Sequence, residues 1–277
     1  MAAVLLALGA SVAWGCADFL GGLYARRYSV PPVTLLAQLG GLAGTAVALA
    51  IAGGPSGIGI GLGALAGVFS GVGATTYYAA LATGTMSVVA PISACGAVVS
   101  LGLALAFGER PSPLQLSGAL LALAGAVLAS FQEHRAGGAS RLSIVLALAT
   151  ALCFGILLYV LGRAADAGGT FSALVGVRFA GAVVVGVWVA SLATRPRFPG
   201  GRALAVVLFV GVLGTVANAL YGFAAERGLL AIVTLLASLY PVTTVVLANR
   251  VLRERLAPVQ AVGVVIALGG VALVAVG

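Results

Sequence analysis

The chain is poor in charge and contains no lysine. Charged residues make up only 7% of its 277 residues, hydrophobic residues make up 62%, and the mean hydropathy is +1.21. A soluble domain carries about 25% charged residues because it must cover its surface. So little charge excludes a soluble globular protein and indicates an integral membrane protein.

The basic residues do not form the stripe that a nucleic-acid-binding surface needs. All fourteen are arginines, and they give the chain a net charge of +8. Most stand at the ends of apolar runs, where charges flank membrane-spanning helices. The sequence therefore predicts a lipid bilayer and a small-molecule substrate as partners, and no nucleic acid.

Cysteine and histidine are scarce as well. Cys16, Cys95 and Cys153 lie inside apolar runs without CxxC spacing, and His134 is the only histidine. This pattern predicts no disulfide framework and no metal site. A GxxxxGK[ST] loop is missing too, so ATP-driven transport by this chain alone is not expected.

Ten apolar runs are long enough to span a membrane as helices. They cover residues 3–23, 31–52, 60–82, 86–107, 113–131, 142–162, 171–193, 203–224, 229–250 and 257–276. Backbone polar groups must be satisfied internally in lipid, so runs of this length predict helices. The first run has no basic segment before it and is expected to be a retained helix instead of a cleaved signal peptide.

The sequence signals of the first five runs recur in the last five. GERPSPLQLSG (108–118) matches RERLAPVQAVG (253–263) in five residue types, Tyr77 matches Tyr221, and Gln38 matches Arg178. Because five is odd, the second half enters the membrane upside down relative to the first. Inverted repeats are typical of secondary transporters, with a site near the midplane between them.

These signals predict an all-α integral membrane protein with ten transmembrane helices, arranged as two inverted five-helix repeats around a central cavity. The predicted repeats cover 1–131 and 142–277, and 132–141 forms a linker.

The chain resembles the EamA branch of the drug/metabolite transporter superfamily. The WGxxxF stretch at 14–19, the Gln38/Arg178 pair and the doubled ERxxPxQxxG motif carry this resemblance. It implies two inverted bundles around a cavity, and export or exchange of small polar or amphipathic metabolites, including amino acids. It also implies no enzymatic activity and no bound cofactor. The family often has Asn where this chain has Asp18, so the coupling chemistry is expected to differ.

Asp18 is a candidate for proton coupling. It lies about fifteen residues into the first run, where a carboxylate costs about 2.5–3.5 kcal/mol and should face water or a partner. Asp18 is therefore expected to bind a proton on one side of the membrane and release it on the other. A static polar contact, or a position near the aqueous boundary, is the alternative.

Arg178 is a candidate for binding substrate in the seventh run. Its guanidinium stays charged, so it is expected to clamp a substrate carboxylate or to pair with Asp18. Snorkelling to the interface is the alternative. Gln38, its repeat mate, and Asn218, another amide within a run, are expected to line the same cavity.

Aromatic residues and prolines inside the runs are further candidates. The expected cavity walls, suited to amphipathic or cationic substrates, are Trp14, Phe19, Tyr77, Tyr78, Tyr221 and Tyr240. Packing or interface anchoring is the alternative for each. Pro91 and Pro241 each remove a helical hydrogen bond and predict a kink, either static or acting as a gate.

Two further features favour structural interpretations. Gly59, Gly63, Gly67 and Gly71 form one helical stripe, which predicts tight packing or a sliding seam. Acidic residues near a helix start are favoured by the macrodipole. The doubled pairs that open the fifth and tenth runs are therefore expected to be caps or loop locks: Glu109/Arg110 and Glu254/Arg255.

Orientation receives two opposite predictions. One side carries ten arginines: Arg26, Arg27, Arg135, Arg141, Arg195, Arg197, Arg202, Arg250, Arg253 and Arg255. The other side, which holds the termini, carries Arg110, Arg163 and Arg227. Positive residues favour the cytoplasm, so the count places both termini outside, whereas the family resemblance places them inside. The lysine-free, alanine- and glycine-rich composition is typical of a bacterial inner-membrane protein, and both a monomer and a homodimer fit it.

Three functions compete at this stage. The leading one is a secondary transporter that uses alternating access, as an exporter or exchanger with proton coupling. The second is a membrane enzyme that uses Asp18 and Glu226 as acid and base, and the third is a non-transporting scaffold. A scaffold would not need charges inside its spans or inverted halves, and no spacing pairs the two acids, so no enzyme activity is expected.

Overall fold

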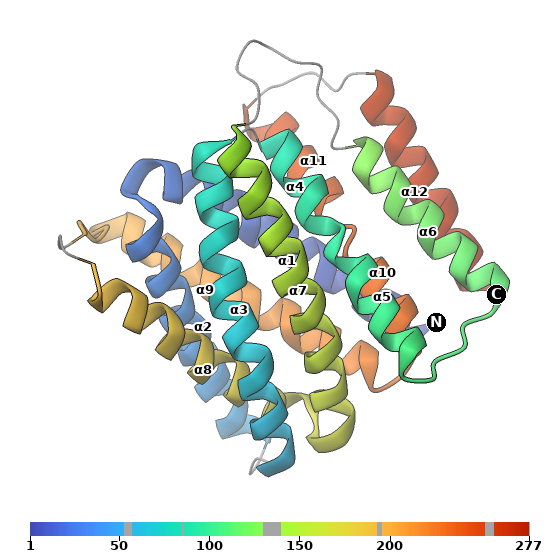
Figure 1. The fold of residues 1–277 in the computed structure, drawn as a ribbon, viewed down its shortest axis with the longest axis horizontal. Coiled ribbons are helices and arrows are strands. Elements are labelled where there is room, and N and C mark those ends of the chain that lie inside the picture. Colours follow the sequence, from blue (N-terminus) through green and yellow to red (C-terminus); the bar gives the residue numbers. More distant parts are fainter. Residues whose placement is uncertain (53–56, 85, 130–139, 193–195, 253–257, 277) are drawn as a thin grey trace.

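Every regular element in the described part of the chain is an α-helix (Figure 1). A computed structural model describes all residues except 53–56, 85, 130–139, 193–195, 253–257 and 277. The first half contains α1 (Ala2–Tyr28), α2 (Val30–Ala52), α3 (Gly57–Thr83), α4 (Met86–Ala94), α5 (Gly96–Ala106) and α6 (Pro113–Ala129). The second half contains α7 (Arg141–Gly168), α8 (Thr170–Ala190), α9 (Gly201–Ala225), α10 (Leu230–Ala237), α11 (Tyr240–Leu252) and α12 (Pro258–Val276).

The ten predicted spans are confirmed, but two of them are broken. In the part of the chain that the structure describes, six helices are long and apolar enough to cross a membrane by themselves: α1, α2, α3, α7, α8 and α9. The single helices α6 and α12 supply the fifth and tenth spans. The fourth span consists of α4 followed by α5, and the ninth consists of α10 followed by α11. The breaks therefore fall at equivalent places in the two halves.

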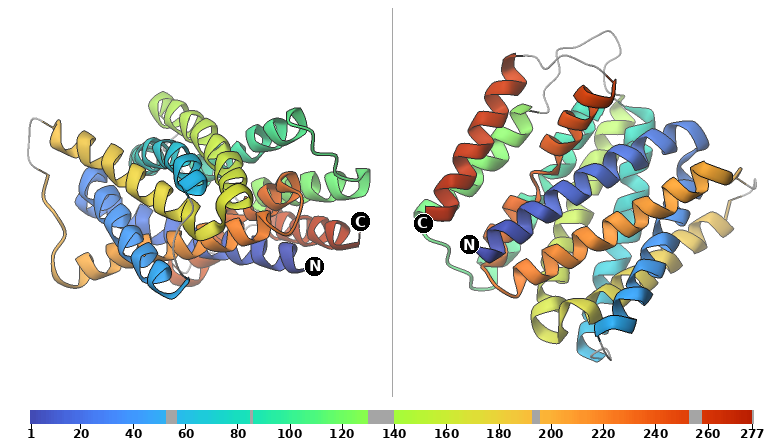
Figure 2. Two further views of the ribbon diagram at one scale, coloured as in Figure 1. Left: turned by 90° about the horizontal axis from the view of Figure 1, so that it is seen from below. Right: turned by 180° about the vertical axis from the view of Figure 1, so that it is seen from behind.

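The pair α6 and α12 shows that the two halves run in opposite directions. These helices lie side by side at one edge of the molecule (Figures 1 and 2). A methyl group at Gly118 would lie 2.9 Å from the carbonyl oxygen of Gly270, and one at Gly125 would lie 2.7 Å from that of Gly263. The start of each helix thus meets the end of the other, so α6 and α12 are antiparallel.

The pair α2 and α8 repeats this relation in the interior. A methyl group at Gly181 would lie 3.0 Å from Nε2 of Gln38, and one at Gly41 would lie 2.9 Å from Cδ of Arg178. Gln38 and Arg178 are repeat mates, and so are the two glycines. Each long side chain therefore lies against the glycine of the other half. Such reciprocity is what a two-fold axis between two inverted repeats produces.

The two halves interlock instead of packing as separate bundles. The third helix of the first half, α3, packs against α7 and α8 of the second half. In the same way α9 packs against α1 and α2 of the first half. The termini lie near each other at one end of the molecule (Figures 1 and 2), as an even number of spans requires.

Carboxylates cap two helices on the side where the termini lie. Glu109, in the loop after α5, accepts hydrogen bonds from the backbone N–H groups of Leu230 (3.1 Å) and Ala231 (2.8 Å) at the start of α10. Glu226 accepts from the N–H of Thr170 at the start of α8, at 2.8 Å. Glu109 thus ties the first half to the second, as a loop lock, and does not cap the α6 helix that it precedes.

The start of α6 is capped by a different pair that the sequence analysis overlooked. Ser112 Oγ accepts from the N–H of Gln115 (3.1 Å), and Gln115 Oε1 accepts from the N–H of Ser112 (3.2 Å). This S-x-x-Q capping box could have been recognised from sequence. Three other predicted features lie outside the described residues: the doubled pair Glu254/Arg255, His134, and residues 132–139 of the predicted linker.

The glycine stripe of α3 is a tight packing seam. Gly59, Gly63, Gly67 and Gly71 are all buried against α8, and a methyl group at Gly63 would collide with the carbonyl oxygen of Ala173. Gly61 lies on the opposite face of α3, where a methyl group would meet nothing within 4 Å. Without a hydrophobic force between helices in lipid, such close backbone approach is a main source of association.

We expect Gly63→Val to destabilise the protein because the added side chain meets backbone that cannot move aside. The cost should be on the order of 1–3 kcal/mol, seen as a lower unfolding temperature of the purified protein in detergent. Gly61→Val is the matched control on the same helix and should leave the unfolding temperature unchanged. Equal effects of the two substitutions would contradict the packing described for α3 and α8.

Candidate functional site

The two helix breaks face a common cavity of about 120 Å³. Ser93 and Gly96 line it at the break between α4 and α5, and Ser238 and Tyr240 line it at the break between α10 and α11. Side chains of α1, α2, α3, α7, α8 and α9 complete the wall. The space is large enough for several water molecules, and it lies where broken helices of transporters place their sites.

A proline lies beside each break. Pro91 stands in the last part of α4, and the chain then tightens at Cys95, whose N–H donates to the carbonyl of Ile92 at 3.2 Å. Pro241 is the second residue of α11, where a missing N–H is tolerated. Pro241 thus fits the restart of the helix at α11, whereas α4 continues for three residues beyond Pro91 before its break. Whether they act as gates stays a prediction.

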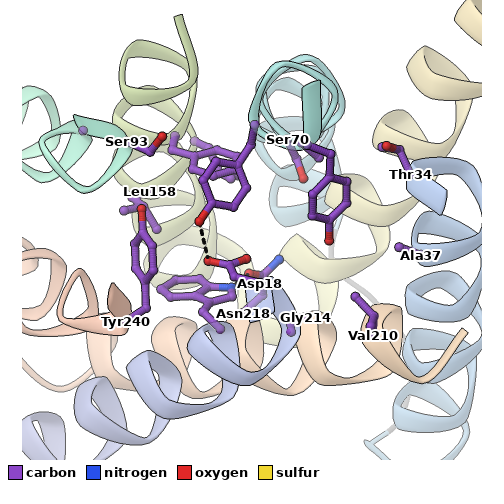
Figure 3. A pocket seen from close by; sticks show the side chains of 18 of the residues that line it. Asp18, Thr34, Ala37, Ser70, Ser93, Leu158, Val210, Gly214, Asn218 and Tyr240 are labelled. Atoms are coloured by element: carbon purple, nitrogen blue, oxygen red, sulfur yellow. Dashed lines mark hydrogen bonds between the residues drawn. The ribbon is translucent and has the colours of Figure 1, made fainter. Parts of the chain in front are cut away.

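Asp18 points into the cavity from α1 (Figure 3). The hydroxyl of Tyr77, on α3, donates to Asp18 Oδ2 at 3.3 Å. A turn earlier on α1, Trp14 Nε1–H donates to Oδ1 of Asn218, on α9, at 3.1 Å. All four side chains line the cavity. Asp18, the acid that the sequence places inside a span, therefore faces polar groups and an open space, not acyl chains.

Glu226 is not part of the group of side chains around Asp18. It follows the last residue of α9, caps the start of α8 and does not line the cavity. The proposed acid–base pair of Asp18 and Glu226 is therefore wrong.

Arg178 lines the cavity from α8 and is only 7% exposed. Its Nη1 donates to Gln38 Oε1 at 3.4 Å, and its Nε is buried without a hydrogen-bond partner. Within the described residues, ion pairs form only between Arg163 and Asp166 and between Arg227 and Glu226. The expected pair of Arg178 with Asp18 is therefore not formed, and its burial also excludes snorkelling.

Four of the six predicted aromatic residues line the cavity, and two do not. Trp14, Tyr77, Tyr78 and Tyr240 contribute to the wall. Phe19 is buried elsewhere because it follows Asp18 directly, and adjacent helical residues point about 100° apart. Tyr221 is fully buried in the apolar core beside the cavity. The expectation that Phe19 and Tyr221 form cavity walls is therefore wrong.

Tyr221 instead belongs to a dry hydrogen-bond network. Its hydroxyl donates to the carbonyl oxygen of Leu158 at 2.8 Å and lies 2.7 Å from Thr234 Oγ1. Thr234 in turn lies 3.2 Å from Ser100 Oγ. This network joins α9, α7, α10 and α5. The three side chains in it, those of Tyr221, Thr234 and Ser100, are each less than 2% exposed.

The two tyrosines thus show how the repeats differ. Tyr77 and Tyr221 are repeat mates, and the match of Trp14 with Phe154 makes Asp18 the mate of Leu158. Each tyrosine donates to the residue at this equivalent position in its own half. In the first half the acceptor is the carboxylate of Asp18, and in the second half it is the backbone carbonyl of Leu158. The first half carries the ionisable version of a contact that the second half keeps neutral. The repeat could also have pointed to Phe154, Ser93 and Ser238, which line the cavity and were not among the predicted site residues.

We expect Tyr221→Phe to lower stability and Tyr77→Phe to leave it nearly unchanged. The first change removes a buried hydrogen bond between neutral groups, worth about 1 kcal/mol. The second leaves Asp18 facing a cavity in which water can replace the tyrosine hydroxyl. Thermal unfolding of the two variants in the same detergent compares them directly. A larger loss in Tyr77→Phe would show that the cavity is dry and that the two contacts are not different in kind.

Comparisons with known proteins agree with this architecture. Residues 1–131 and 141–276 each match the model of the EamA-like transporter family. One solved structure, titled only as a crystal structure of a protein, is similar to the chain, with a TM-score of 0.78 and 20% sequence identity. The similarity covers 99% of this chain and 96% of the other. At that identity the similarity shows the fold alone. No curated protein shows significant sequence similarity to the chain. Since the two matches span nearly the whole sequence, the chain belongs to the EamA-like transporter family and is a multi-pass membrane transporter, not a member of an enzyme family.

Proposed function

We propose that this chain is a secondary transporter that moves small polar or amphipathic metabolites, amino acids among them, by alternating access, as an exporter or exchanger. The observation that carries the proposal is the position of the cavity. It lies between two inverted repeats, at the breaks of both discontinuous spans, and one acid and one base line it. Transporters built from inverted repeats place their substrate at such a point.

The repeats, 1–131 and 142–277 with the linker 132–141, would exchange their conformations during the transport cycle. All eight residues of α10 are buried, and Glu109 holds the start of this helix on the side of the termini. We infer that α10, with the buried hydrogen-bond network of Tyr221, separates the cavity from that side. Transport would require α10 and its network to separate while the equivalent elements of the first half close.

Asp18 is the residue that would couple protons to this cycle. An ionised carboxylate only accepts hydrogen bonds, whereas a protonated one also donates. Protonation would therefore change which hydrogen bonds Asp18 can form with Tyr77 and with a bound substrate, without any change in the rest of the wall. The equivalent position in the second half is Leu158, so only one half would respond to protons.

We also propose that the protein resides in a bacterial inner membrane. Because the termini lie together at one end of the molecule, a single fusion of a reporter to the C-terminus fixes the orientation of both. A reporter active only outside the cytoplasm tests the arginine count against the orientation that the family implies.

Purified protein in liposomes tests the function directly. We expect substrate to cross the membrane without chemical change, and a pH gradient to drive its accumulation. Asp18→Asn should abolish the pH-driven accumulation while exchange of labelled for unlabelled substrate continues, because asparagine binds the same partners but carries no proton. Transport that follows the pH gradient equally well in Asp18→Asn removes Asp18 from the coupling step, and substrate that emerges chemically altered would overturn the transporter assignment itself.

A further inference from the structure

We propose that Arg178, positioned by Gln38, binds the carboxylate group of the transported substrate. This inference rests on the proposed function and names the chemical group of the substrate that Arg178 would recognise. It concerns a guanidinium that the described structure leaves without a counter-ion, on the wall of the central cavity.

The fold builds a slot for this guanidinium. Gly41 of α2 and Gly214 of α9 flank it: a methyl group at Gly41 would lie 2.9 Å from Nε and one at Gly214 would lie 3.1 Å from Nη2 of Arg178. Any larger residue at Gly41 would press on the arginine. The Gly41 carbonyl is itself fixed, since it accepts from Thr215 Oγ1 (3.0 Å) and Thr45 Oγ1 (2.9 Å). Two helices from opposite halves therefore hold the planar group in one orientation.

The hydrogen-bonding groups of Arg178 are not used up by the protein. Nη1 donates to Gln38 at a long 3.4 Å, and the buried Nε has no partner. A buried charge without a partner is strongly unfavourable, and a buried donor without an acceptor costs further free energy. Nε and the neighbouring Nη2 form the edge that binds a carboxylate through two parallel hydrogen bonds. An anionic group of the substrate would satisfy both deficits at once.

The charge distribution of the cavity favours a carboxylate within a small molecule of low net charge. Asp18 lines the same cavity but forms no ion pair with Arg178 in the described structure. It would repel a second negative group at its own end. Arg178 binds a planar fork of oxygens better than lysine would, because its donors are fixed in a matching plane. The site therefore favours a substrate with one carboxylate, bound by Arg178 and not by Asp18.

The fluorescence of Trp14 can measure substrate binding independently of transport. The chain has two tryptophans, Trp14 on the cavity wall and Trp188 near the end of α8. In a Trp188→Phe background the emission of Trp14 reports on the cavity alone. The probes are the proteinogenic amino acids and short-chain carboxylates, each compared with its carboxamide, which keeps the shape and removes the anionic charge.

We expect at least one carboxylate to change Trp14 emission, and its carboxamide to bind at least tenfold more weakly. Arg178→Gln should weaken the carboxylate by about 10- to 100-fold, as loss of a charged hydrogen bond does, and leave the carboxamide unchanged. Gly41→Ala keeps the arginine but places a methyl group against its Nε, and it should weaken binding of the carboxylate several-fold. Gly44→Ala is the matched control one turn further along α2, where a methyl group meets nothing closer than 3.8 Å.

Any one of three results would overturn the assignment. The first is that no carboxylate of the panel alters Trp14 emission, and the second is that carboxamides bind as tightly as carboxylates. The third is that Arg178→Gln and Gly41→Ala both bind the carboxylate with unchanged affinity. The liposome assay separates this failure from failure of the proposed function. Flux that persists with any of these results leaves the transporter intact and removes only the carboxylate site. Binding that follows Arg178 without any flux keeps the site and removes transport.

Discussion

The close approach of helix backbones across the two halves is the interaction on which the rest of this structure depends. In lipid the apolar surface of a helix gains little from meeting another helix, so association relies on tight packing of small residues. Here the glycines of α3 meet α8, and those of α6 meet α12, with contacts that no larger residue would permit. Because these contacts join the two halves, they fix the inverted arrangement and with it the cavity between them.

The inverted arrangement also makes a symmetric frame for groups that are not symmetric. Tyr77 and Tyr221 occupy equivalent places, yet one donates to the Asp18 carboxylate and the other to a backbone carbonyl. Gln38 and Arg178 are likewise equivalent, one neutral and one charged. A backbone that repeats without repeating its charges would allow the halves to exchange conformations, while under the proposals above only one half responds to protons and only one holds an anion.

Much of the fold could be predicted, because its signals are local or repeated along the chain. Apolar runs report spans directly, since each helix must satisfy its own backbone in lipid. The doubled ERxxPxQxxG motif reported the repeat, and an odd number of spans then required inversion. The breaks of the fourth and ninth spans were only partly foreseen. Pro91 and Pro241 marked the region, but the matching serines lie closer to the breaks: Ser93 in the last turn of α4 and Ser238 directly after α10.

By itself the sequence determined the membrane class, the ten spans, the two inverted halves and the family, because composition and repetition do not depend on how helices are rotated. Only the tertiary structure decided which polar groups share the cavity. It brought Asp18, Arg178, Gln38 and Asn218 to the same cavity and left Asp18 and Arg178 without an ion pair to each other. It also placed Tyr221 in a dry network. These outcomes depend on the rotation and crossing of neighbouring helices, which set the direction of each side chain and are not encoded in any one span.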